Sequence, residues 1–166
     1  YAGAQSDKDS LLLIWEDEAK DISIRCNAYA DYIVQQFLFN QPDTSYKMLY
    51  ELLNLLDKEV YESKEVDRAK IFNLIGISFY LRSQFDESIK YYTNSLEIQE
   101  CLNNPEGVSK CLNNIGYTYF KQADNLRALE YYKRSLLFSE TLKSKEIYAV
   151  TLGNIGLVYA DQNDYD

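Results

Sequence analysis

Apolar residues recur at helical spacing along nearly the whole chain. In "YKMLYELLNLL", residues 46–56, they are three and four positions apart, as on one face of an α-helix. Pro42 and Pro105 are the only prolines, and glycine is scarce. The pattern therefore predicts an all-α protein.

One stretch of this pattern recurs three times. It reads "FNLIGISFY" at residues 72–80, "LNNIGYTYF" at 112–120 and "LGNIGLVYA" at 152–160, so that Gly76, Gly116 and Gly156 are each 40 residues apart. A glycine inside a helix costs about 1 kcal/mol relative to alanine, and non-local packing must compensate for it. A fixed period of about 20 to 50 residues indicates an array of structural repeats.

Other positions follow the same period. An aromatic residue recurs at Phe79, Tyr119 and Tyr159, and the segments "ESIKYYTNSL" (87–96) and "RALEYYKRSL" (127–136) align with each other. These columns resemble the tetratricopeptide repeat family, in which every repeat is a hairpin of a helix A and a helix B. The resemblance covers about residues 65–166. It implies an α-α superhelix of antiparallel helix hairpins, a tetratricopeptide-like solenoid.

The resemblance also gives the glycines a role. Without a side chain, helix A can approach helix B closely enough for a small residue to pack against its backbone, and the tyrosines fill the space between hairpins. The residues expected to make this packing are Gly76, Gly116, Gly156, Ser88, Ala128, Tyr92 and Tyr132.

Capping and turn residues divide the chain. Asn104 and Ser144, each followed by the first turn of a helix, are one period apart, and turns between helices A and B are expected at 82–86, 121–125 and 161–166. Asn125 replaces an aromatic residue, which predicts a locally looser hairpin. The expected parts are a flexible leader at 1–9, a capping helix at 10–20, a degenerate hairpin at 21–62, repeats at 63–102 and 103–142, and helix A of a truncated repeat at 143–166.

Two expectations concern the ends of the array. In the degenerate hairpin, helix A would span Ser23 to Phe39, and Gln36 replaces the glycine of the family, so this hairpin should pack with a different spacing. At the other end the sequence stops just as the last helix B should begin. We therefore expect further repeats or an output domain beyond Asp166.

Charge and hydropathy limit the partners. The chain has 17 basic and 26 acidic residues, a net charge of −9, and no cluster of Lys and Arg suited to a phosphate backbone, so nucleic acid is not expected. No apolar run is long enough to insert into a membrane. Ala2 and Ala4 ahead of Gln5 resemble the end of a secretory signal and suggest an extracytoplasmic, periplasmic location. An ordinary leader on a cytoplasmic protein is the alternative.

The residues that usually carry catalysis are scarce. The sequence has no histidine and no glycine-rich phosphate loop, and the acidic run "WEDEAK" at 15–20 is typical of a solvated helix face. Cys26, Cys101 and Cys111 contain no CxxC spacing and are expected to be free, partly buried thiols, with a bond between Cys101 and Cys111 as the alternative. We expect no enzyme activity, no cofactor and no metal.

The resemblance implies a binding groove on the concave face of the helix A row. Asn114 and Asn154 match a position at which long-repeat members hold the backbone of an extended peptide, a task that suits an amide because it both donates and accepts. Bonds to neighbouring helices or water are the alternative for these asparagines. Of the carboxylate clamp of chaperone-binding members, only Asn114 is matched. The candidate groove residues are Lys70, Asn73, Ile77, Tyr80, Lys110, Asn114, Tyr117, Phe120, Asn154 and Leu157.

Two functions are compatible with these features. The first is a non-catalytic module that binds a protein or peptide segment in this groove. The second is a regulatory one, because the layout also resembles the N-terminal sensor regions of bacterial signalling proteins that end in a histidine kinase, a nucleotide cyclase or a helix-turn-helix domain.

Overall fold

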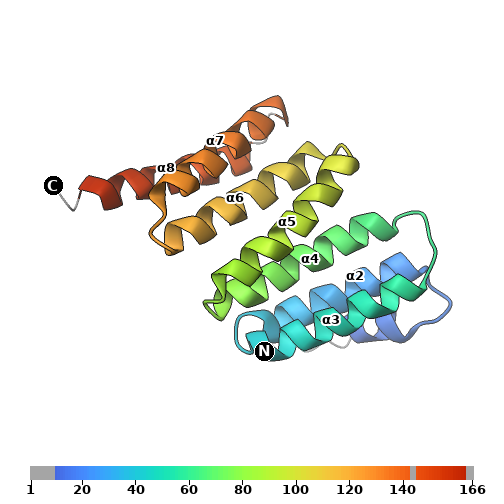
Figure 1. The fold of residues 1–166 in the computed structure, drawn as a ribbon. Helices are drawn as coiled ribbons and strands as arrows, with labels where there is room; N and C mark the ends of the chain where they lie inside the picture. Colours follow the sequence, from blue (N-terminus) through green and yellow to red (C-terminus); the bar gives the residue numbers. More distant parts are fainter. Residues whose placement is uncertain (1–9, 143–144, 164–166) are drawn as a thin grey trace. The chain divides into compact units, whose positions relative to one another are not determined.

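The computed structural model describes residues 10–142 and 145–163, which form helices and turns with no β-strand among them (Figure 1). The all-α class predicted from the apolar pattern is therefore confirmed. The chain divides into two compact units, Tyr1–Gln84 and Phe85–Asp166. Within the described ranges, no helix combines the length and the apolar character needed to cross a membrane.

The first unit is built from helices that pack against one another. Helix α2 (Ile22–Ile33) contacts both α3 (Pro42–Lys58) and α4 (Lys64–Leu81), and α3 contacts α4. Asp21 caps α2 by accepting a hydrogen bond from the backbone N–H of Ser23 at 2.8 Å. The elements are a short helix at 10–16, α2 (Ile22–Ile33), the π-helical turn η1 (Val34–Leu38), α3 (Pro42–Lys58) and α4 (Lys64–Leu81).

The helix at 10–16 packs on α2 through aromatic stacking. The rings of Trp15 and Tyr29 are 4.6 Å apart and nearly parallel. This helix is shorter than the expected 10–20, because the side chain of Asp17 accepts a hydrogen bond from the backbone N–H of Ala19 at 3.1 Å and so stabilises a turn in place of a further helical turn.

Helix A of the degenerate hairpin is not a continuous α-helix. Its α-helical part ends at Ile33, and Gln36 lies in the middle of the π-helical turn. A π-turn holds more residues than an α-turn and so rotates the side chains that follow it around the axis. Leu38, at the end of the turn, is fully buried. The replacement of glycine by Gln36 thus coincides with a change of helix geometry that spacing alone did not predict.

The described residues of the second unit form four consecutive helices. They are α5 (Phe85–Cys101), α6 (Pro105–Lys121), α7 (Asn125–Leu142) and α8 (Lys145–Asn163), coloured from green to red in Figure 1. Helix α6 contacts α5, α7 and α8. The side chain of Asn104 accepts a hydrogen bond from the N–H of Gly107 at 3.3 Å, which confirms it as the N-cap of α6. The corresponding Ser144 lies outside the described residues.

The turns after α4, α5 and α6 share one geometry, with Ser83, Asn103 and Ala123 in the left-handed region at φ 58°, 48° and 59°. After α6, Ala123 N–H donates to Phe120 O at 3.0 Å and Asp124 N–H to Tyr119 O at 2.9 Å, as in a Schellman motif. The turns at Ser83 and Ala123 lie within the predicted segments 82–86 and 121–125. By contrast, α8 continues to Asn163, past the start of the turn expected at 161–166, and residues 164–166 lie outside the described part.

Helices α6 and α7 pack closely at Gly116. A Cβ atom there would lie 2.9 Å from the ring of Tyr132 and 3.2 Å from the carbonyl oxygen of Ala128, both shorter than ordinary contacts. Tyr132 and Ala128 are fully buried in this unit. The glycine is therefore needed at this position because the backbone of α7 and a buried ring occupy the space of a side chain.

Hydroxyl groups join three helices of the second unit. The hydroxyls of Ser109 on α6 and Ser135 on α7 are 2.9 Å apart, and Ser135 also lies 3.4 Å from the hydroxyl of Thr151 on α8. All three side chains are fully buried. At the start of α7, Asn125 donates to Asp161 of α8 at 3.0 Å. The residue expected to loosen this hairpin thus makes a polar contact with the next helix.

The cysteines are free thiols. Cys26 and Cys111 are buried, whereas Cys101 is exposed rather than partly buried as expected. Burial, followed by the negative charge of Asp67, raises the pKa of Cys26 to about 11, and burial also raises the pKa of Cys111. Both buried thiols are therefore protonated and unreactive at neutral pH.

Candidate functional site

The ten candidate groove residues form two sets. One set lies on α4 in the first unit, and the other lies on α6 and α8 in the second unit, two helices in contact with each other. Helical spacing places the members of each set on a common side of their helix. The sets are Lys70, Asn73, Ile77 and Tyr80 on α4; Lys110, Asn114, Tyr117 and Phe120 on α6; and Asn154 and Leu157 on α8.

The aromatic members of the second set pack on the buried core of the second unit. Tyr117 and Phe120 pack against the buried cluster of Ala128, Tyr132 and Val158, and their ring centroids are 6.4 Å apart. The Lys121 ammonium lies 5.5 Å from the centre of the Tyr117 ring, in cation–π geometry. Both rings are partly exposed, so they offer a preformed apolar surface at the side of α6.

Asn154 makes a side-chain contact that the sequence did not predict. Its Nδ2 donates to Oδ1 of Asn113 on α6 at 3.1 Å, so the amide of α8 pairs with the residue next to Asn114. Asn114 itself accepts a hydrogen bond at its backbone oxygen from the hydroxyl of Thr118 at 2.9 Å. For Asn154, the alternative of a bond to a neighbouring helix is what the structure shows.

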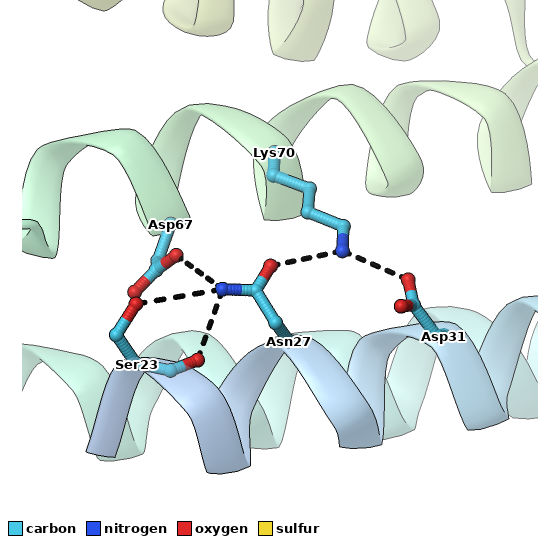
Figure 2. Close-up of polar contacts among 5 residues, drawn as sticks. All are labelled: Ser23, Asn27, Asp31, Asp67 and Lys70. Atoms are coloured by element: carbon cyan, nitrogen blue, oxygen red, sulfur yellow. Dashed lines mark hydrogen bonds and ion pairs between the residues drawn. The ribbon is translucent and has the colours of Figure 1, made fainter. Parts of the chain in front are cut away.

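In the first unit, Lys70 is held by the preceding helix (Figure 2). Its Nζ donates to Oδ1 of Asn27 at 2.9 Å and to Oδ1 of Asp31 at 2.8 Å. Asn27 and Asp31 are one helical turn apart on α2. Two of the three donors of the ammonium group are therefore used within the protein.

A buried carboxylate fixes the orientation of Asn27. Its Nδ2 donates to Oδ1 of Asp67 at 2.8 Å and to the backbone oxygen of Ser23 at 2.9 Å, so its Oδ1 faces Lys70 (Figure 2). Asp67 also accepts a hydrogen bond from the Tyr61 hydroxyl at 2.9 Å. Burial and this hydrogen bond raise the pKa of Tyr61, which keeps the phenol protonated as the donor. The network is a structural link between α2 and α4.

Sequence reasoning missed Asn113, Asn27 and Asp31. The 40-residue period could have pointed to two of them, because Asn113 is one period after Asn73 and Asn27 is one period before Asp67. What it could not give is the orientation of an amide towards its neighbour, which depends on contacts between helices.

Two pockets in the described part of the second unit were not predicted from the sequence. The first pocket has a volume of about 390 Å³ and is polar. In its lining, Asp124 accepts hydrogen bonds from the backbone N–H and the guanidinium of Arg127, and these two bonds hold the pKa of Asp124 below its usual value. Neither pocket contains a candidate groove residue, and no group of His, Cys, Asp and Glu within the described ranges could hold a metal ion. The linings are Asp86, Ile89, Tyr119, Gln122, Asp124 and Arg127 for the first, and Glu100, Asn103, Asn104, Pro105, Val108, Leu137 and Phe138 for the second, of about 480 Å³.

Comparisons with known proteins agree with this architecture. The family model described as tetratricopeptide repeat matches residues 67–140. Among curated proteins, none matches the chain. The crystal structure of BtubC (BKLC) from P. vanneervenii is similar with a TM-score of 0.73 and 20% identity, over 96% of this chain and 65% of that one.

Two further crystal structures have the same fold. Aspartyl phosphate phosphatase F from Bacillus subtilis is similar with a TM-score of 0.79 and 16% identity, over 89% of this chain and 38% of that one. The apo form of RapI is similar with a TM-score of 0.74 and 18% identity, over 88% of this chain and 40% of that one. This chain thus spans less than two thirds of the length of each of the three structures. Residues 67–140 thus match the tetratricopeptide repeat model, and the chain has the helical-repeat fold of the three solved structures.

Proposed function

We propose that the chain is a non-catalytic module that binds an extended protein or peptide segment along the α6–α8 face, which we define by Asn113, Asn114, Tyr117, Phe120, Asn154 and Leu157. The observation that carries this proposal is the amide pair of Asn113 and Asn154. The match of residues 67–140 to the tetratricopeptide repeat model is consistent with a protein-interaction module.

The amide pair has capacity for a ligand. Each asparagine has two N–H donors and an oxygen with two lone pairs, and the bond between Asn154 and Asn113 uses one donor and one acceptor site. Both side chains are partly exposed. The bond fixes their orientation before a ligand arrives, which lowers the entropy cost of binding a peptide unit.

Apolar side chains flank the amides. Tyr117 and Phe120 are anchored on the core of the unit, and Leu157 on α8 is half exposed. An extended peptide presents alternate side chains to such a surface while its backbone bonds to the amides. The face therefore offers both kinds of contact that peptide recognition needs.

The α4 set is less suited to this task. Lys70 already bonds Asn27 and Asp31, so a ligand would have to replace two contacts within the protein to engage it. We therefore place the peptide on the second unit. The regulatory alternative stays a hypothesis, because the likeness to the three structures concerns the fold alone. The extracytoplasmic location also stays a prediction, since residues 1–9 lie outside the described part.

The test uses a peptide selected from a random display library by the 166-residue chain. We expect replacement of Asn113 and Asn154 by alanine to weaken its binding at least about tenfold, because unpaired ligand groups cost about 1–3 kcal/mol each, while the helical circular dichroism stays unchanged. Asn54→Ala, at an exposed amide of α3 in the first unit, is the matched control and should bind as the wild type does. Equal affinity of the double variant and the control would contradict the proposal.

A further inference from the structure

The larger of the two pockets lies where α5 ends and α6 begins, beside the second half of α7. Its volume of about 480 Å³ is typical of pockets that hold small ligands. Three consecutive helices and one turn supply its walls. These are Glu100 from α5, Asn103 and Asn104 from the turn, Pro105 and Val108 from α6, and Leu137 and Phe138 from α7. We call it the α5–α6–α7 pocket.

Most of the side chains that line this pocket are apolar. Val108 is buried, whereas Leu137 is 66% exposed. Pro105 and Phe138 are partly exposed. An exposed leucine is ordinary by itself. Next to a proline and a phenylalanine around one concave space, however, it adds to an apolar surface that a ligand can remove from water.

The repeat pattern does not require this apolar lining. One period earlier, three of the lining columns hold charged residues, namely Glu65, Arg68 and Glu97 in place of Pro105, Val108 and Leu137. Charged residues in these columns are thus compatible with the repeat. Packing between hairpins therefore does not by itself explain the apolar set around this pocket.

Hydrogen bonds hold the three helices around the pocket. The hydroxyls of Ser109 on α6 and Ser135 on α7 are 2.9 Å apart, and the Cys111 thiol of α6 donates to the Ser95 hydroxyl of α5 at 3.3 Å. Asn104 caps α6 and so fixes the turn at the edge of the pocket. The pocket is formed before a ligand arrives, which lowers the entropy cost of binding.

One carboxylate lies among the lining residues. Glu100 is exposed, and its side chain makes no ion pair within the described ranges. Arg134, one turn before Phe138, lies over the ring of Tyr131 at 5.2 Å. The chain has a net charge of −9, so its overall field also attracts cations. The charge at the pocket is therefore complementary to a cation that is joined to an apolar group.

We propose that the α5–α6–α7 pocket binds a small amphiphilic cation, whose aromatic or branched aliphatic group contacts Val108, Leu137 and Phe138 and whose ammonium group pairs with Glu100. The apolar walls supply most of the affinity, and the carboxylate selects the charge of the ligand. This pocket shares no residue with the α6–α8 face, and the inference does not depend on the proposed function.

The test uses three probes with the same phenylpropyl group. Phenylpropylamine is cationic at neutral pH, phenylpropanol is uncharged and phenylpropanoate is anionic. Each is titrated into the isotope-labelled 166-residue chain at low ionic strength, and NMR follows the backbone amides. We expect the amine to shift the amides of the lining residues, with a dissociation constant on the order of 1 mM. It should bind at least about threefold more tightly than the other two probes.

Two matched variants test the charge. Glu100→Gln keeps the size of the side chain and removes its charge, so the affinity for the amine should fall at least about threefold while that for phenylpropanol stays within about twofold. Glu97→Gln removes the same charge from an exposed position on α5 outside the lining. It should leave the affinity for the amine within about 1.5-fold of wild type.

A second pair of variants tests the apolar wall. Leu137→Ser should weaken the amine and phenylpropanol at least about threefold, because apolar contact is lost. Leu126→Ser, at a leucine that is 82% exposed at the start of α7 and outside the lining, should leave both affinities unchanged. Because both leucines are largely exposed, the two variants should fold as wild type does, and circular dichroism checks this.

Three outcomes would overturn the proposal. They are an amine that leaves the amides of the lining residues unshifted, a phenylpropanoate that binds as tightly as the amine, and an equal loss of affinity for the amine in Glu100→Gln and Glu97→Gln.

Discussion

Helices α6 and α8 share the leucine, glycine and tyrosine columns of the repeat but have unlike surroundings. Gly116 and Gly156 occupy the same column, yet a Cβ atom would clash with Tyr132 and Ala128 at the first and would meet no described atom at the second. Leu112 is fully buried, whereas Leu152 is nearly half exposed. The comparison teaches that the repeat pattern encodes the shape of a helix face, while the neighbouring helix decides what each residue on it contributes to stability.

The leucines should show the largest difference. We expect Leu112→Ala to lower the free energy of unfolding by about 2–5 kcal/mol, because it leaves a cavity between α6 and α7. Leu152→Ala should change it by less than about 1 kcal/mol, since the side chain is half exposed. Urea unfolding followed by circular dichroism measures both. Similar losses in the two variants would mean that α8 is as well covered as α6.

The glycines should differ by less. Gly116→Leu should destabilise the chain by about 2 kcal/mol or more, because a side chain would force α6 away from α7, and the melting temperature should fall by several degrees. Gly156→Leu should leave it unchanged or raise the free energy of unfolding by up to about 1 kcal/mol, since leucine is the better helix former. A melting temperature of Gly116→Leu within a degree or two of wild type would contradict the close-packing explanation.

Hydroxyl groups should give the smallest contrast. Ser109→Ala removes a buried hydroxyl that bonds both the hydroxyl and the backbone oxygen of Ser135, and should cost about 1 kcal/mol. The reciprocal Ala149→Ser, at the exposed position one period later, should change the free energy of unfolding by less than about 0.5 kcal/mol. Thermal melts of the two variants beside wild type provide the measurement, and a loss of stability in Ala149→Ser as large as in Ser109→Ala would contradict the comparison.

The repeats were predictable because the same residue types recur at the same spacing in each repeat. The helical class, the glycine column and the N-cap at Asn104 all follow from spacing and local preference. The π-helical turn at Gln36 was not predictable in this way, because the sequence departs from the repeat there and gives no second copy to compare. Asn125 shows the same limit, since its bond to Asp161 depends on a helix 36 residues away.

The sequence predicted the positions of the candidate site residues better than it predicted their side-chain contacts. The period placed Asn154 on the same helix face as its counterpart, but it did not predict the hydrogen bond from its side chain to Asn113. Lys70 was assigned to a groove, yet it bonds Asn27 and Asp31 of the preceding helix. A side chain that can reach either a ligand or a neighbouring helix leaves the same pattern in the sequence, and only the distances between helices distinguish the two.

The buried hydroxyls of Ser109, Ser135 and Thr151 have a consequence for alignment errors during folding. An interface made only of leucine and alanine tolerates slippage by one helical turn, because one apolar contact replaces another. Slippage of α7 along α6 would separate the hydroxyls of Ser109 and Ser135 from each other and from the backbone oxygens that they bond, at about 1–3 kcal/mol apiece. Thr151 keeps its bond to Ile147 O within α8. Ser109 and Ser135 therefore favour the native alignment of α6 and α7 over neighbouring misaligned ones.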